Sequence, residues 1–313
     1  MNSDPSKHDA PRPPASQPAA RSRAASESAR RFDVLLSLLQ DDSPVVLAEV
    51  RSQFLSAGRA GEQALRRAVR SGSAHQRGRA RQLLLVLDRR RVVRRLIRRV
   101  SAGVDLERGL FLLDNYWSPG LDVRPYRKAL DAMANMVQRE AARRSPGIER
   151  AHALVHVLSK EMGFCGATDD FHHPDNIFLG RSIERRRGMP LTLCAIFAFV
   201  ARRAQIKTSL LPFPGHILLR LHHGPRPSDT SIVDPFGGGQ ILAEKQCLAY
   251  IDQHGLTFRP EWLRPASAAD LFERHVRNLR QSCRARGRFA EARELELVLR
   301  ATADSDQTGA ALR

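Results

Sequence analysis

From Phe32 to about Val100, apolar residues recur every three or four positions, which is the period of amphipathic helices. Ser43-Pro44 predicts a helix start, because serine is a good cap and proline suits the first turn. The segments "EQALRRAVRSG" and "ARQLLLVLDRRRVVRRLIRRV" follow, separated by glycine and serine. Residues 32–103 are therefore predicted to form three or four packed helices.

Helical segments continue to about residue 164 and are followed by a polar, turn-rich connection with one short helix near 176–187. Pro190 starts a segment in which Leu191 to Val200 are almost all apolar, which predicts a helix buried on every face. After it, "TSLLPF", "HILLRLHH" and "TSIVDPF" show the short apolar runs of strands. Two amphipathic helices, "AADLFERHVRNLRQSCRARG" and "RFAEARELELVLRATAD", close the chain around Gly287. We therefore expect an α+β core flanked by helical elements.

The two ends of the chain have a different composition. Residues 1–31 are rich in Pro, Ser, Ala and Arg and carry almost no bulky apolar side chain, which predicts a disordered tail. Residues 306–313 are expected to fray. Between them we expect a helical region at 32–103, a core at 104–262 and a helix pair at 263–305.

Charge and cysteine usage narrow the function classes. The net charge is +18, but the basic residues are spread along helices and only five of the 51 are lysine. This predicts solvated helix faces with weak, nonspecific polyanion binding; a nucleic-acid binder is an alternative that rests on charge alone. There is no apolar run long enough for a membrane span and no secretory signal core. Four cysteines without a CxxC pair fit a reducing cytoplasm, so a cytoplasmic protein is expected.

His216 and Asp234 are the first candidates for chemistry. Gly224-Pro225 marks a turn between two predicted strands, and a hairpin centred on residue 225 places His216 directly opposite Asp234. The aspartate could then accept the ring N–H and fix the tautomer, as in a nucleophile–base–orienter set. A purely structural pair that satisfies two buried polar groups is the alternative.

A nucleophile is harder to find. The helix start favours a thiolate, but here it reads "GMPLT" and holds no cysteine. Cys194 lies one turn later in an apolar stretch, where burial predicts a raised pKa. Cys165, in the turn "GFCG", could reach the site from another element. His152 and His156 have metal-ligand spacing without the glutamate of HExxH, so neither a metal nor a cofactor is expected.

Several of these stretches occur together in one known family. "GFCGATDDFHHPDNIFLGRSIERRRGMPLTLCAIFAFVARRAQI", "FPGHILLRL" and "VDPFGGG" resemble the transglutaminase-like superfamily of the SirB type. The motif residues outside the triad are Asn176, Gly188 and Gly215. The resemblance implies a papain-like fold, with a helix packed on an antiparallel sheet, over residues 104–262. The terminal helix pair resembles a tetratricopeptide unit, and residues 32–103 faintly resemble HEAT repeats.

The resemblance also implies a Cys-His-Asp triad, of which only part is present. His216 and Asp234 match the histidine and the aspartate, while Pro190 stands where catalytic relatives have cysteine. We therefore expect a non-catalytic domain that acts as an interaction or regulatory module. The alternative is a cysteine-dependent hydrolase or acyltransferase that uses Cys165 or Cys194.

Overall fold

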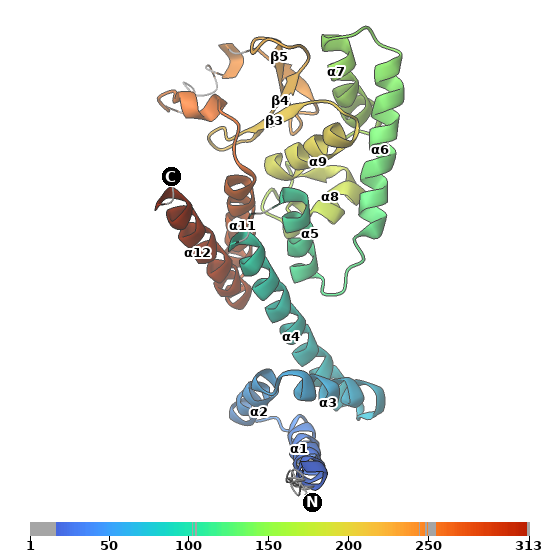
Figure 1. Cartoon of the computed structure of the whole chain (residues 1–313), viewed down its shortest axis with the longest axis vertical. Helices are drawn as coiled ribbons and strands as arrows, with labels where there is room; N and C mark the ends of the chain where they lie inside the picture. Colours follow the sequence, from blue (N-terminus) through green and yellow to red (C-terminus); the bar gives the residue numbers. More distant parts are fainter. Residues whose placement is uncertain are drawn as a thin grey trace, which may run out of the picture. The chain divides into compact units, whose positions relative to one another are not determined.

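The computed structural model describes residues 17–311 except for positions 102, 104, 244, 248 and 250–254. The chain divides after residue 88 into two compact units (Figure 1). The division falls inside helix α4 (Ala74–Ser101). The sequence predicted a boundary at residue 103; the second half of α4 instead buries Val92, Val93 and Leu96 in the core of the second unit.

The first unit is helical. It contains α1 (Gln17–Leu38), α2 (Pro44–Ser56), α3 (Gly58–Ser71) and the first half of α4. Helix α2 begins at Pro44 after Ser43, as the sequence predicts. The core forms around two stacked rings, Phe32 and Phe54, whose centroids lie 5.9 Å apart.

The predicted disordered tail, residues 1–31, differs from the structure in its second half. Residues 1–16 lie outside the described residues, but α1 already begins at Gln17. The segment after Gln17 is rich in alanine and arginine, which are strong helix formers. A lack of bulky apolar side chains removes core packing from a segment, but it does not remove this local helix propensity.

After the second half of α4, the second unit continues with four α-helices and one π-helix. They are α5 (Leu106–Trp117), α6 (Arg124–Ala142), α7 (Ile148–Val155), which continues as a π-helix (His156–Glu161), and α8 (Leu179–Arg185). Buried Asp114 of α5 joins two of them, because its carboxylate accepts hydrogen bonds from the backbone N–H groups of Leu179 (3.0 Å) and Gly180 (2.7 Å) at the start of α8. Burial outweighs these bonds and raises the pKa of Asp114 to about 7.

Helix α9 (Pro190–Arg203) lies at the centre of this unit. Eleven of its 14 residues are buried, as the apolar run predicts. It packs against the first two strands of an antiparallel sheet with the order β3 (Thr208–Leu211), β4 (Leu218–His222), β5 (Thr230–Asp234) and β6 (Gln240–Leu242) (Figure 1). A short parallel pair, β1 (Cys165–Gly166) and β2 (Arg187–Gly188), lies on the chain before α9. The α+β fold class is confirmed.

Two helices close the described chain after a 3-10 turn (Pro260–Leu263). They are α11 (Ala268–Ala285) and α12 (Phe289–Ala311), which pack against each other. A capping box between Ser267 and Asp270 starts α11. Helix α11 also packs on α5, and its Ser282 hydroxyl donates to the carbonyl of His172 (2.7 Å). The helix pair is thereby part of the second unit.

His275 of α11 is buried without a completed hydrogen bond at either ring nitrogen. Burial lowers the pKa of His275 to about 4, and the nearby backbone of Ile177 offsets this only in part. The unfolded chain therefore binds a proton at this histidine between pH 6.5 and about 4, while the folded chain does not. Through His275 alone, falling pH in this window favours unfolding. Asp114 acts in the opposite direction, because its raised pKa makes the folded chain bind that proton before the unfolded chain does.

We predict that the free energy of unfolding falls by on the order of 3 kcal/mol as the pH drops from 6.5 to 4 through this group alone. His275→Leu removes the ionisable ring, so the change in its free energy of unfolding over that window should differ from that of the unchanged protein by about 3 kcal/mol in favour of the folded state at low pH. Urea unfolding at several pH values measures it, with the exposed His75→Leu as the control. An unchanged slope in His275→Leu would show that other groups cause the acid sensitivity.

Candidate functional site

The His216–Asp234 pair forms the centre of the candidate site. The Nε2 atom of His216 lies 2.8 Å from Oδ1 of Asp234, and each side chain is 17% exposed. A carboxylate can only accept, so Nε2 carries the proton and Nδ1 is left as the acceptor. No described residue forms a hydrogen bond with Nδ1. A ring with its proton on Nε2 and none on Nδ1 is the tautomer that a general base requires.

Two tight turns hold this pair in place. Gly215 has a φ of +67°, which glycine adopts without strain, and the N–H of His216 donates to the carbonyl of Phe213 (3.1 Å). Asp234 ends β5, where its Oδ1 also accepts from the N–H of Phe236 (2.9 Å). A Cβ on Gly237 would lie 2.8 Å from Oδ2 of Asp234. The motif "DPFGG" thus wraps its backbone around the carboxylate.

The hairpin register differs from the predicted one. The strands pair Leu219 with Val233 and Leu221 with Ser231, so the hairpin is centred on residue 226 and not on 225. His216 therefore lies two residues before β4 and reaches Asp234 from the preceding loop. The predicted hydrogen bond is confirmed, but the direct strand pairing that motivated it is wrong. The stretch "HHGPRPSDT" is symmetric about Arg226, because its first residue His222 pairs with its last residue Thr230, whereas the prediction placed the centre of the turn at Pro225.

Arg274 of α11 supports the same loop, and sequence reasoning missed it. Its guanidinium donates to the carbonyls of Phe213 (3.3 Å) and His216 (3.0 Å). Burial lowers the pKa of Arg274, so the loop carbonyls hold a partly desolvated cation. One signal was available, because an arginine on a helix face that is otherwise apolar must find polar partners. The sequence could not say which partners these are.

The start of α9 contains no thiol. Pro190 is its first residue and Met189 precedes it, with no side-chain cap. The N–H of Met189 is engaged by the carbonyl of Asn176 (2.8 Å). The hydroxyl of Thr192 donates to the carbonyl of Ile177 (3.1 Å) and is buried. The helix start is therefore sealed by proline and by backbone hydrogen bonds.

Cys194 lies one turn further along α9. Its side chain is completely buried, and its Sγ donates to the carbonyl of Ile217 (3.2 Å), which follows His216 directly. Burial raises the pKa of the Cys194 thiol; the negative charge of Asp234 adds to this, and Arg274 opposes it. The thiol is thus close to the site but is held in its protonated, unreactive form.

Cys165 of β1 is half-buried and unpaired. Its N–H donates to the carbonyl of Arg186 (3.1 Å), and neighbouring Gly166 lies against the ring of Phe236, where a Cβ would come within 2.6 Å. The Phe236 ring in turn meets the His216 ring edge-on at 5.8 Å. Cys165 is therefore two packing contacts away from the imidazole, and its thiol forms no hydrogen bond with any residue that the structure describes.

Asn176 and Gly188 join the segments before α9. The amide of Asn176 donates to the carbonyls of Asp170 (2.9 Å) and Phe171 (3.3 Å), and its Oδ1 accepts from Arg185 (2.9 Å). A Cβ on Gly188 would lie 2.8 Å from Oγ of Ser182. Hydrogen bonds thus explain the asparagine at position 176, and close packing explains the glycine at position 188.

Two further findings on the described residues concern a metal site and a membrane-crossing helix. Within the described ranges, no group of three or more His, Cys, Asp or Glu side chains is arranged to hold a metal ion. His152 instead contacts the hydroxyl of Ser231 (3.2 Å), and His156 contacts Glu161 (3.2 Å). Among the helices described, none combines the length and apolar character that crossing a bilayer requires.

Comparison with known proteins shows a family similarity over the region that contains this site. Residues 124–277 match the family model described as the transglutaminase-like superfamily. The chain contains a transglutaminase-like domain. The matched segment includes His216, Asp234 and Arg274, and it begins at the first residue of α6.

Relatives with similar sequences come from bacteria and from mammals. A UPF0162 protein of Xylella fastidiosa is 30% identical over 46% of this chain and 50% of its own length. One from Pseudomonas aeruginosa is 29% identical over 49% of this chain and 56% of its own length. Human F-box only protein 21 is 29% identical over 33% of this chain and 17% of its own length. The chain thus spans about half the length of the UPF0162 relatives. No solved structure matches it.

We predict that His216→Ala lowers the free energy of unfolding by roughly 1–3 kcal/mol, because it leaves the half-buried carboxylate of Asp234 without its ring partner. Chemical denaturation measures this, with the exposed His75→Ala as the control. A loss no larger than that of the control would mean that the pair contributes nothing to the fold.

Proposed function

We propose that this transglutaminase-like domain is non-catalytic and acts as a binding or regulatory module. The observation that carries the proposal is the state of Cys194, whose thiol is fully buried and donates to a backbone carbonyl. Acyl transfer needs an exposed thiolate beside the imidazole. Pro190 cannot provide one at the helix start, and the site keeps only a base and its orienter.

The remaining His216–Asp234 pair then has a structural role. It joins the loop before β4 to the end of β5, and Arg274 links the same loop to α11. This arrangement supports a SirB-type subfamily, in which the C-terminal helices act as a tetratricopeptide-like element of the same module. A protein partner and a cytoplasmic location remain predictions; the four unpaired cysteines support the second.

The second candidate is a cysteine-dependent hydrolase or acyltransferase, and one observation favours it. Cys165 is accessible in part, the Phe236 ring connects its strand to the His216 ring, and no described residue forms a hydrogen bond with Nδ1 of His216. Bringing the thiol and the imidazole together would then require a movement of this strand. The state of the thiols in solution distinguishes the two candidates.

We predict that iodoacetamide modifies Cys165 first in the native protein, at a rate that His216→Ala does not change, while Cys194 reacts only after unfolding. Burial of the Cys194 thiol is the physical reason. Mass spectrometry of timed samples locates the label, and denatured protein serves as the control for full reactivity.

The enzyme candidate makes the opposite prediction. Fast labelling of either cysteine that collapses in His216→Ala, with the melting temperature checked separately, would demonstrate a working thiolate–imidazole pair and overturn the non-catalytic proposal.

A further inference from the structure

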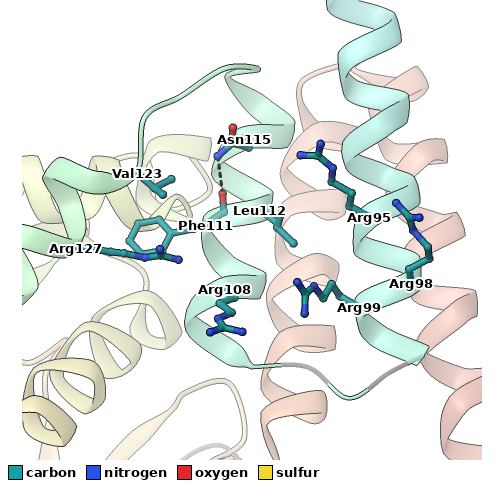
Figure 2. A pocket seen from close by; sticks show the side chains of 9 residues that line it. All are labelled: Arg95, Arg98, Arg99, Arg108, Phe111, Leu112, Asn115, Val123 and Arg127. Carbon is teal, nitrogen blue, oxygen red and sulfur yellow. Dashed lines mark hydrogen bonds between the residues drawn. The ribbon is translucent and has the colours of Figure 1, made fainter. Parts of the chain in front are cut away.

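The second unit has a further feature that lies away from the His216–Asp234 pair. A cavity of about 780 Å³ is formed by α4, α5 and the start of α6, and five arginines line it together with Phe111, Leu112, Asn115 and Val123 (Figure 2). The arginines are Arg95, Arg98 and Arg99 of α4, Arg108 of α5 and Arg127 of α6. No acidic side chain lines it.

The three arginines of α4 share one face of the helix, because positions i, i+3 and i+4 are neighbours. Figure 2 shows Arg95 and Arg99 reaching from α4 towards α5, with Arg108 on the facing helix. The side chains of these four arginines form no ion pair with any residue that the structure describes. Four guanidinium groups are thus gathered around one cavity without a counter-charge.

Arg127 is the fifth, and its partners are weak. It lies over the ring of Phe111 at 5.5 Å and approaches Glu107 at 3.9 Å. The carboxylate of Glu107 is already bound by Arg202 and Arg203, with distances of 2.6 and 2.8 Å. The nearest buried carboxylate therefore does not neutralise the cavity.

Helix stability does not explain this gathering. Arg98 and Arg99 end α4, where the helix dipole favours positive charge. Arg108 and Arg127, however, lie in the first turns of α5 and α6, where the dipole opposes positive charge. The helix dipole therefore does not account for guanidinium groups at these two positions, and a bound anion would reduce both the mutual repulsion and the unfavourable dipole interaction.

We propose that this cavity binds a compact anion that carries two or more phosphate groups. Arginine forks bind phosphate oxygens through paired hydrogen bonds, and five of them around one cavity match several charges within one small ligand. The side-chain amide of Asn115 cannot donate both of its N–H groups to the anion, because its Nδ2 already donates to the carbonyl of Phe111 (3.3 Å). Recognition is therefore by charge and by guanidinium geometry.

A nucleic-acid strand fits the observations less well. An adjoining hollow of about 500 Å³ extends the arginine surface along α4, which would suit a polymer. Sequence-tolerant binding of single strands, however, relies on exposed aromatic rings on which bases stack. Among the described residues that line the cavity, Phe111 alone has an aromatic ring, and it is 2% exposed.

The test is titration of the full chain with sodium tripolyphosphate at about 150 mM salt, where loose surface attraction is screened. Calorimetry gives the affinity and stoichiometry, and the melting temperature gives an independent readout. The site variant is Arg95→Gln with Arg99→Gln and Arg108→Gln. The control variant is Arg59→Gln with Arg67→Gln and Arg70→Gln, three exposed positions of α3 that remove the same net charge.

We expect one tripolyphosphate per chain, a raised melting temperature, and a loss of affinity of at least about tenfold in the site variant but not in the control. Arg99→Gln alone, at the exposed end of α4, repeats the comparison if the triple variant does not fold. Equal losses in both variants, no saturable binding, or preference for a single-stranded oligonucleotide over tripolyphosphate would each overturn the proposal.

Discussion

Helix α9 is buried on nearly every face, and this burial organises the second unit around it. A helix without a solvent-facing side must have every polar group satisfied from within the protein. Thr192 therefore donates to Ile177 and Cys194 to Ile217. Only the end of the helix carries charge, where Arg202 and Arg203 pair with buried Glu107. Removal of both arginines would leave the buried carboxylate of Glu107 with the more distant Arg127 (3.9 Å) as its remaining described cation partner, which is destabilising.

The same burial determines what the candidate site can do. A thiol in the interior of α9 is near Asp234 and the backbone of His216, yet desolvation keeps it protonated. A thiol at the first turn would instead face free N–H groups and a favourable dipole. Proline occupies that turn. His216 and Asp234 have the hydrogen-bond geometry of a base and its orienter, and the same contact joins the loop before β4 to the end of β5.

The partners of each arginine in this molecule depend on its tertiary neighbours and not on the total number of charged residues. Most arginines of the second unit with named partners form local or long-range ion pairs, as Arg89 does with Glu291 and Arg286 with Asp170. Arg274 and Arg185 instead donate to carbonyl or amide oxygens. Around the α4–α5 cavity, Arg95, Arg98, Arg99 and Arg108 form no ion pair with a described residue. An excess of positive charge in the composition could not distinguish a solvated helix face from a cavity lined with guanidinium groups.

The sequence by itself determined the local elements. The apolar run after Pro190 predicted a buried helix, and the shift to short apolar strands after Lys207 predicted the sheet, because local periodicity reflects which faces are buried. The His216–Asp234 contact was also within reach, since a turn between two strands limits the partners. Only the tertiary structure decided the hairpin register, which depends on the conformation of the turn. It alone brought Arg274 to the loop of His216 and five arginines from three helices to one cavity, because such contacts join residues that no local pattern relates.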